Sequence, residues 1–210
     1  MRTRVKICGI TTLADARVAL EAGADHVGLI FTESPRRVTL DQARRIREAL
    51  PPEAPLVGVF AEEPPEVVAP IQAALSLPVV QVAGWLEGEP GLSCEVWHVL
   101  RAAGLPDPAT LPMIPLRTFL LDTHDPARSG GTGRPADWDW ARRAVEAGLR
   151  LVVAGGLSAE NVAEVVTGVR PYGVDASSRL ERAPGLKDPA RVRAFIARVR
   201  ETDRVRPRLS

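Results

Sequence analysis

The sequence predicts an α/β protein built as a single (β/α)₈ TIM barrel with eight parallel strands. Short apolar, β-rich runs alternate with amphipathic helical patterns from one end of the chain to the other. Strict alternation implies a parallel sheet with right-handed crossovers. The chain has 210 residues, of which 45% are hydrophobic, so it can bury one substantial core. Eight units in a chain near the lower size limit of the fold favour a closed barrel over an open sheet.

The first half of the chain supplies four of the expected strands. The pattern predicts strands at residues 5–10, 25–31, 56–60 and 79–82, and helices at residues 12–22, from 39 onward, and at 64–75. The second of these helices carries apolar residues at three- and four-residue spacing, which places them on one face, at Leu40, Ala43, Ile46 and Leu50.

The second half repeats the theme. Strands are expected at residues 93–99, 118–122, 150–154 and 172–176. Helices are expected at residues 137–147 and after an N-cap at Ser158. A final helix is expected at the C-terminus, where Val192 and Phe195 begin a buried face. Residues 106–115 are too rich in proline for a regular long helix, so the fifth helix should be short or irregular. Residues 1–201 should form the barrel, and the basic, proline-containing stretch 202–210 a C-terminal tail.

The composition excludes several function classes. Lys plus Arg number 27 and Asp plus Glu 26, so no broad electrostatic field favours nucleic acid or a membrane surface. Cys8, Cys94 and the three histidines have no metal-ligand spacing and form no disulfide framework, so we expect no metal. No apolar run reaches the ~18 residues of a membrane span. The chain enters a strand-like segment at once, without the apolar region of a secretory signal. We therefore expect a reducing, cytoplasmic setting.

In a TIM barrel the chemistry lies where the strands end. The first strand ends with Lys6 and Cys8 on one face, because side chains alternate along a strand. Cys8 is a candidate base if a nearby cation lowers its pKa, and otherwise a small buried hydrophobic residue. Asp122 ends the sixth strand, where a carboxylate must be paired, hydrogen-bonded or functional; an Asx turn or a helix cap is the alternative.

Candidate ligand-binding residues follow other strands. Arg36 comes after the second strand, where a planar guanidinium can hold a carboxylate or phosphate or can simply be solvated. The segment 129–133 contains Gly130 and Gly131, which suits close backbone approach to a ligand but also a plain flexible loop. Gly-rich and hydroxyl-bearing turns after strands seven and eight are the usual phosphate cradle of this fold, and the residues concerned are Gly155, Gly156, Ser177 and Ser178.

Taken together, these segments resemble the phosphoribosylanthranilate isomerase family over nearly the whole chain. The order and spacing of the matching runs are highly specific. The runs are Lys6–Ile10, Gly23–Asp25 with Val27–Gly28, Ser34–Arg36, Val57–Phe60, Leu121–Thr123, Gly130–Gly133, Asp137–Trp138, Ala154–Leu157, Asn161–Val162, Asp175–Ser178, Glu181 and Pro184–Asp188.

The resemblance implies a cofactor-free Amadori rearrangement of N-(5-phosphoribosyl)anthranilate to the corresponding deoxyribulose phosphate. It implies that Asp122 is the general acid that opens the furanose ring and that Cys8, as a thiolate, is the general base that removes the C2 proton. It further implies that Arg36 holds the anthranilate carboxylate, while Gly156 and Ser178 with neighbouring amides hold the phosphate. The partner would be a small phosphorylated substrate, and the sequence leaves a homodimer open.

The chain departs from the family pattern at three places. Ala83 stands where the family usually has a histidine at the fourth strand end, Arg179 stands where it commonly has glycine, and the fifth unit matches poorly. The first departure removes a side chain that could bind substrate or anchor a loop, and the second alters the phosphate turn.

Three alternatives remain beside the isomerase reading. The histidine-pathway isomerase of the same fold typically uses two aspartates, whereas this chain has Cys8 in the first-strand position. Indoleglycerol-phosphate synthase depends on lysine chemistry, and Lys6 and Lys187 are the only lysines here. A phosphosugar-binding barrel without catalysis would need neither Cys8 nor Asp122.

Overall fold

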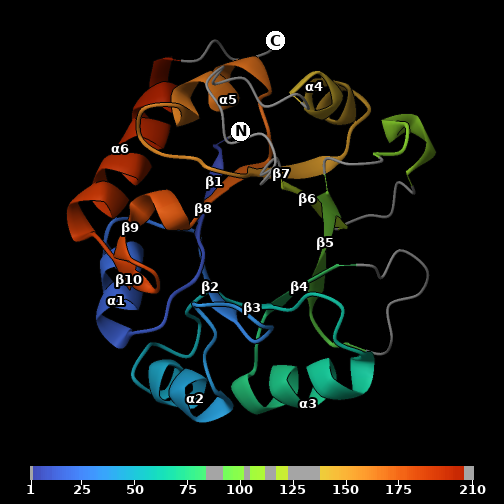
Figure 1. Cartoon of the computed structure of the whole chain (residues 1–210). Coiled ribbons are helices and arrows are strands. Elements are labelled where there is room, and N and C mark those ends of the chain that lie inside the picture. Colours follow the sequence, from blue (N-terminus) through green and yellow to red (C-terminus); the bar gives the residue numbers. More distant parts are fainter. Residues whose placement is uncertain (1, 84–91, 102–104, 112–116, 123–137, 206–210) are drawn as a thin grey trace.

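The computed structural model is a closed barrel of eight parallel strands surrounded by helices (Figure 1). It describes residues 2–83, 92–101, 105–111, 117–122 and 138–205. The strands stand around the barrel in chain order, and every neighbouring pair, including β1 with β8, is parallel. The predicted (β/α)₈ fold is therefore confirmed.

The eight barrel strands lie close to the predicted positions. They are β1 Arg4–Ile7, β2 His26–Ile30, β3 Leu56–Val59, β4 Val79–Ala83, β5 Glu95–Arg101, β6 Thr118–Asp122, β7 Arg150–Ala154 and β8 Gly173–Ala176. β1 ends three residues earlier than expected, so Cys8, Gly9 and Ile10 belong to the loop that leaves the barrel.

The described helices pack on the outside of the strands. They are α1 Leu13–Glu21, α2 Leu40–Glu48, α3 Pro65–Leu75, α4 Trp138–Glu146, α5 Val162–Gly168 and α6 Pro189–Val205. Between β5 and β6 the described residues form only the 3₁₀ turn η1 Pro108–Thr110, in line with the short or irregular fifth helix expected from the prolines. None of the helices in the described ranges is long and apolar enough to cross a membrane.

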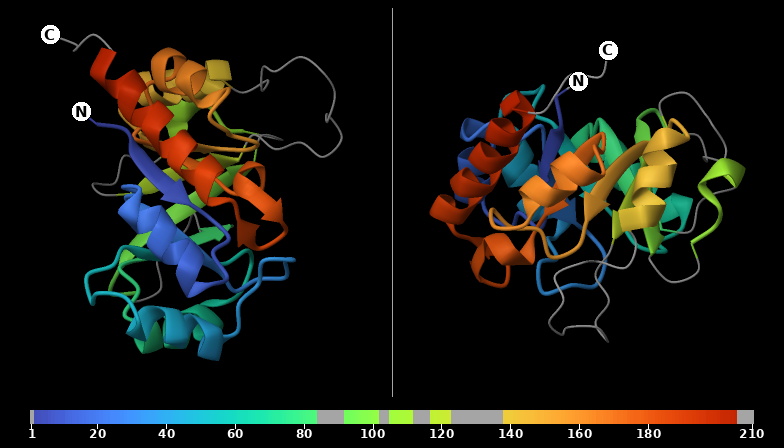
Figure 2. Two further views of the ribbon diagram at one scale, coloured as in Figure 1. Left: turned by 90° about the vertical axis from the view of Figure 1, so that its left-hand side faces the viewer. Right: turned by 90° about the horizontal axis from the view of Figure 1, so that it is seen from above.

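Additional elements follow β8 before the last helix. A 3₁₀ turn, η3 Ser178–Leu180, leads into a two-stranded antiparallel hairpin of β9 Glu181–Ala183 and β10 Leu186–Lys187. Figure 2 shows the hairpin at the opposite end of the barrel from the amino terminus. Because β1 runs from the amino terminus toward that end, the hairpin lies beside the carboxyl ends of the strands.

Local signals explain where the helices begin. Thr12 and Thr39 cap α1 and α2, and Thr39 forms a reciprocal capping box with Gln42. The expected cap at Ser158 was wrong, because one turn separates it from α5 and Asn161 takes the N-cap position without capping the helix through its side chain. The Asn161 amide instead folds back, accepting a hydrogen bond from the Ser158 N–H and donating one to the Gly156 carbonyl.

The last helix runs to Val205, past residue 201, where we expected the barrel to end. Thr202 is buried, and Asp203 accepts hydrogen bonds from the backbone N–H and the hydroxyl of Thr3 at 2.9 and 2.7 Å. These contacts fasten the end of α6 to the start of β1. The tail therefore begins later than the sequence suggested, and residues 206–210 lie outside the described part of the chain.

Apolar side chains form two separate clusters. The larger one fills the space between strands and helices, with Val5, Leu29 and Leu151 from the strands and Val166 from α5. The smaller one fills the barrel interior and includes Cys8 with, among others, Val57, Val79, Trp97, Leu120, Val152 and Ala154. Cys8 therefore faces the inside of the barrel.

Candidate active site

Cys8 lies at the mouth of the barrel beside a buried ion pair. The Lys6 ammonium lies 2.8 Å from an Asp175 carboxylate oxygen, and both side chains are almost completely buried. A Cβ built on Gly28 would lie 3.0 Å from the Cys8 sulfur and 3.2 Å from the Lys6 Cε, so both side chains pack over this bare stretch of β2. The predicted common face of Lys6 and Cys8 is confirmed.

The electrostatics around Cys8 oppose one another. Burial raises the pKa of the Cys8 thiol above its ordinary value, and the positive charge of Lys6 acts in the other direction. Burial also raises the pKa of Asp175, while Lys6 lowers it. The Lys6 ammonium is thus shared by two groups that both need a cation to carry a negative charge.

Asp122 is the last residue of β6 and is partly exposed. The pKa of Asp175 is raised mainly by burial, and Lys6 opposes this. The negative charge of Asp122 also raises it, so Asp122 acts on the Lys6–Asp175 pair. The barrel therefore brings Asp122 and Cys8 to the same end, around the Lys6–Asp175 pair.

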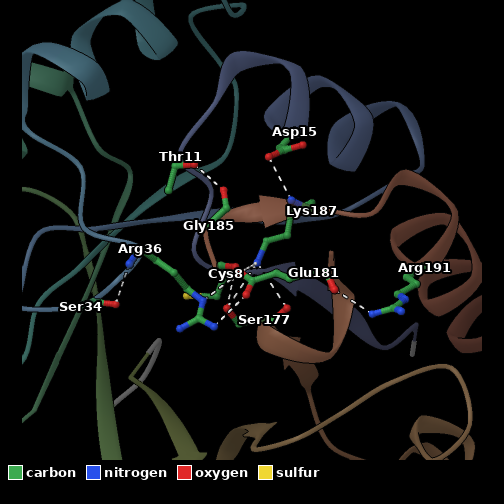
Figure 3. A network of polar contacts seen from close by, with 10 residues as sticks. All are labelled: Cys8, Thr11, Asp15, Ser34, Arg36, Ser177, Glu181, Gly185, Lys187 and Arg191. Atoms are coloured by element: carbon green, nitrogen blue, oxygen red, sulfur yellow. Dashed lines mark hydrogen bonds and ion pairs between the residues drawn. The ribbon is translucent and has the colours of Figure 1, made fainter. Parts of the chain in front are cut away.

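Arg36 is held by a carboxylate. Its Nε and Nη2 donate to the two oxygens of Glu181 at 2.8 and 2.7 Å, and its backbone N–H donates to the Ser34 hydroxyl (Figure 3). A Cβ on Gly9 would approach the Arg36 Cδ to 2.7 Å, so the arginine crosses directly over the loop after Cys8. The predicted location of Arg36 beside the barrel mouth agrees with the structure, and Glu181 as its partner was not foreseen.

A second buried lysine extends this network. The Lys187 Nζ lies 2.7 Å from Glu181 Oε1, 3.3 Å from the Ser177 carbonyl and 3.4 Å from its hydroxyl, and the Lys187 side chain is fully buried. The Ser177 hydroxyl in turn donates to the Cys8 carbonyl at 3.0 Å. One chain of contacts therefore joins the loops that follow β1, β2 and β8.

The predicted phosphate cradle lies after β7 and β8. Gly155 and Gly156 both have positive φ, a conformation that favours glycine, and Asn161 braces the carbonyl of Gly156. Ser178 begins the η3 turn next to Ser177. Backbone amides at turns of this kind are good anion ligands.

Two predicted site residues are not located. Gly130 and Gly131 lie outside the described residues, in the segment 123–137. Within the described ranges, no group of three or more His, Cys, Asp or Glu side chains could hold a metal ion.

Sequence reasoning gave no roles to Asp175, Glu181 or Lys187. One signal was available, because Lys6 and Asp175 each stand between apolar residues of a strand, and charges in such a place need partners. The pairing itself could not be read from the sequence, since 169 residues separate these two and 145 separate Arg36 from Glu181.

Comparisons with known proteins agree on one family. Residues 5–198 match the model of the N-(5'-phosphoribosyl)anthranilate (PRA) isomerase family. An N-(5'-phosphoribosyl)anthranilate isomerase of Pelobacter propionicus is 45% identical over 204 residues, which cover 95% of this chain and 96% of the relative. The enzyme of the same name from Geobacter sulfurreducens is 45% identical over 205 residues, covering 94% and 98%.

Solved structures lead to the same result. The phosphoribosylanthranilate isomerase of Thermotoga maritima superposes with a TM-score of 0.80 at 34% identity, covering 95% of this chain and 99% of that one. A phosphoribosylanthranilate isomerase in complex with reduced 1-(o-carboxyphenylamino)-1-deoxyribulose 5-phosphate gives a TM-score of 0.78 at 32% identity, with the same coverage. With a matching family model over most of its length and close relatives of one kind, the chain belongs to the phosphoribosylanthranilate isomerase family.

Proposed function

We propose that Cys8 and Asp122 carry the two proton transfers by which this chain converts N-(5'-phosphoribosyl)anthranilate to 1-(o-carboxyphenylamino)-1-deoxyribulose 5-phosphate. The observation that carries the proposal is the position of the Cys8 thiol inside the barrel, beside the Lys6 ammonium and at the same end as Asp122. A base and an acid at the ends of different strands can address different atoms of one substrate.

The rearrangement needs one acid and one base and balances within the substrate. Asp122 donates a proton to the furanose oxygen, the C1–O bond breaks, and the nitrogen lone pair forms an imine. The Cys8 thiolate then removes the C2 proton, which yields an enolamine that tautomerises to the ketone. C2 is oxidised and C1 is reduced, so no external oxidant or reductant takes part.

Substrate binding uses the remaining residues. Arg36 holds the anthranilate carboxylate, and the turns with Gly155, Gly156, Ser177 and Ser178 hold the phosphate. Gly130 and Gly131 are proposed as substrate contacts from the sequence alone. Arg179, which is exposed on η3, adds a positive charge close to this cradle.

The test is turnover of phosphoribosylanthranilate generated in situ, with the wild type compared with Cys8→Ala and Asp122→Asn. General acid and base groups typically contribute ~10²–10⁴-fold each, so kcat should fall by that range in each variant. Binding of the reduced product should change little. Because burial raises the pKa of Cys8, kcat/KM of the wild type should rise with pH as the thiolate becomes populated.

The alternatives make different predictions. Binding of the reduced product without turnover by the wild type would identify a binding module, and turnover of the histidine-pathway ribotide in preference to the anthranilate would identify the other isomerase. Full activity of Cys8→Ala would refute the role of the thiol.

Location and assembly are further proposals. We propose a cytoplasmic enzyme, in keeping with its place among tryptophan-biosynthesis enzymes. We also propose a homodimer, since the Thermotoga maritima enzyme is described as dimeric. Light scattering coupled to size exclusion would refute the dimer if the mass equalled 22.6 kDa at micromolar concentration.

A further inference from the structure

The side chain of Arg36 is engaged along one edge only. The two N–H groups that reach Glu181 belong to Nε and Nη2, which lie on the same edge of the guanidinium. The opposite edge carries two parallel N–H groups, one on Nη1 and one on Nη2, and this is the fork that binds a carboxylate end-on. Among the described residues no other side chain forms a hydrogen bond or an ion pair with this guanidinium, and the Arg36 side chain is 20% exposed.

Glu181 is itself immobilised from three sides. Its side chain is buried, one of its oxygens accepts from Arg36 and from Lys187, and its backbone carbonyl accepts from Arg191 at 2.7 Å. Burial alone would raise the pKa of Glu181, but the hydrogen bonds from Arg36 and Lys187 lower it, so the carboxylate stays charged. Arg36 and Lys187 share this one carboxylate, which fixes the position of both cations.

Lys187 ties this group to the phosphate turn. Its ammonium contacts both Glu181 and the backbone and hydroxyl of Ser177 (Figure 3). The backbone N–H of Lys187 is also fixed, by the buried Asp15 carboxylate at 3.2 Å. The β9–β10 hairpin therefore sets the distance between the Ser177 turn and the outer edge of Arg36, by which we mean the edge with Nη1 and Nη2. The substrate does not have to impose this distance.

We propose that Glu181 is a positioning residue that presents the outer edge of Arg36 to the carboxylate of the substrate, and that Lys187 sets the spacing between this edge and the phosphate cradle. The site then selects ligands that carry two anions at a fixed separation, a carboxylate on the aglycone and a phosphate on the sugar. This inference rests on the proposed function, because it assumes that Arg36 binds the substrate carboxylate.

The test compares the affinities of two ligands, the reduced product and the same molecule made from aniline, which lacks the carboxylate. A hydrogen-bonded charge pair contributes ~1.5–3 kcal/mol, which corresponds to a preference of about 10- to 150-fold for the carboxylate ligand in the wild type. In Glu181→Gln this preference should fall to a few-fold, while the affinity for the aniline ligand stays within about twofold. KM should rise more than kcat falls.

Matched variants separate positioning from folding. Glu48→Gln makes the same chemical change at an exposed site on α2 and should keep the wild-type preference. Glu181→Gln combined with Lys187→Met removes the lysine charge that the single variant leaves unpaired, so the comparison can be made even if Glu181→Gln folds poorly. Arg36→Met should abolish the preference, and adding Glu181→Gln to it should cause no further loss.

The outcomes distinguish the two proposals. If Arg36→Met loses the carboxylate preference and Glu181→Gln keeps it, the positioning role is refuted while the proposed function stands. If Arg36→Met keeps the preference, the role of Arg36 in the proposed function is wrong, and the positioning role fails with it. Equal loss of both ligands in Glu181→Gln would show a purely structural residue and would also overturn the inference.

Discussion

Replacing Lys6 with methionine should make the stability of the barrel depend on pH in a way that reveals its buried ion pair. The Lys6 and Asp175 side chains are 1% and 8% exposed, and their charges are 2.8 Å apart. Removing one member of such a pair leaves a buried charge without its partner, which costs about 3–5 kcal/mol. For a chain of this size each kcal/mol lowers Tm by about 2–4 °C, so the expected decrease is about 6–20 °C near neutral pH.

The sign of the pH dependence follows from Asp175. Burial already raises its folded-state pKa above the ordinary 3.8, and loss of Lys6 should raise it further. Between pH 3.8 and the raised folded-state pKa of Asp175, the folded state keeps a proton that the unfolded state has released. Stability therefore falls as pH rises, by up to ~1.4 kcal/mol per pH unit. Below pH 3.8 both states are protonated, so stability no longer depends on pH through this group.

The assay is urea unfolding of the wild type, Lys6→Met, Asp175→Asn and the double variant at several pH values from 4 to 8. We expect the double variant to recover much of the stability lost in Lys6→Met, because it removes the unpaired carboxylate as well. A loss in Lys6→Met that is equal at pH 4 and pH 8, or a double variant no more stable than Lys6→Met, would refute the reasoning.

Two further predictions concern Gly9 and His26. Gly9→Ala should lower both stability and substrate affinity, because the new Cβ would lie 2.7 Å from the Arg36 Cδ at a φ of +73°. Gly23→Ala, with a φ of +97° and open space around its Cβ, is the control for backbone strain alone. Equal effects of the two substitutions on thermal unfolding and KM would contradict the steric argument. Burial lowers the pKa of His26, which packs edge-on against Trp97, to about 4. Unfolding should therefore take up a proton at this residue between about pH 4 and 6.5, so the contribution of His26 to stability should rise with pH across that window. A His26→Phe variant with the same pH dependence as the wild type in urea unfolding would disprove this.

Much of the fold could be read from the sequence, because its signals are local. The strands predicted at residues 118–122 and 150–154 coincide with β6 and β7, because each contains a short apolar run, Phe119–Leu121 and Leu151–Ala154, as expected of a strand buried on both faces. Ser158 misled for a local reason as well: Asn161, three residues later, accepts the Ser158 N–H, and the chain makes an extra turn before the helix starts.

The candidate site was predictable only residue by residue. The position of Cys8 and Arg36 at strand ends followed from the topology of the barrel, but their partners depend on which distant segments meet there. Glu181 lies on a hairpin that the eight-unit pattern does not contain, and it reaches Arg36 only because η3 and β9 turn back over the barrel mouth. A pattern of hydrophobic residues carries no information about a contact between two such distant segments.

The burial of both lysines has a practical consequence for the chemistry of the protein surface. Lys6 and Lys187 are the only lysines in the chain and are 1% and 0% exposed, so the exposed cations are guanidinium groups. Amine-directed reagents should therefore find no accessible lysine side chain on the native protein. Incorporation of an amine-directed label at either lysine would report directly that the barrel had opened.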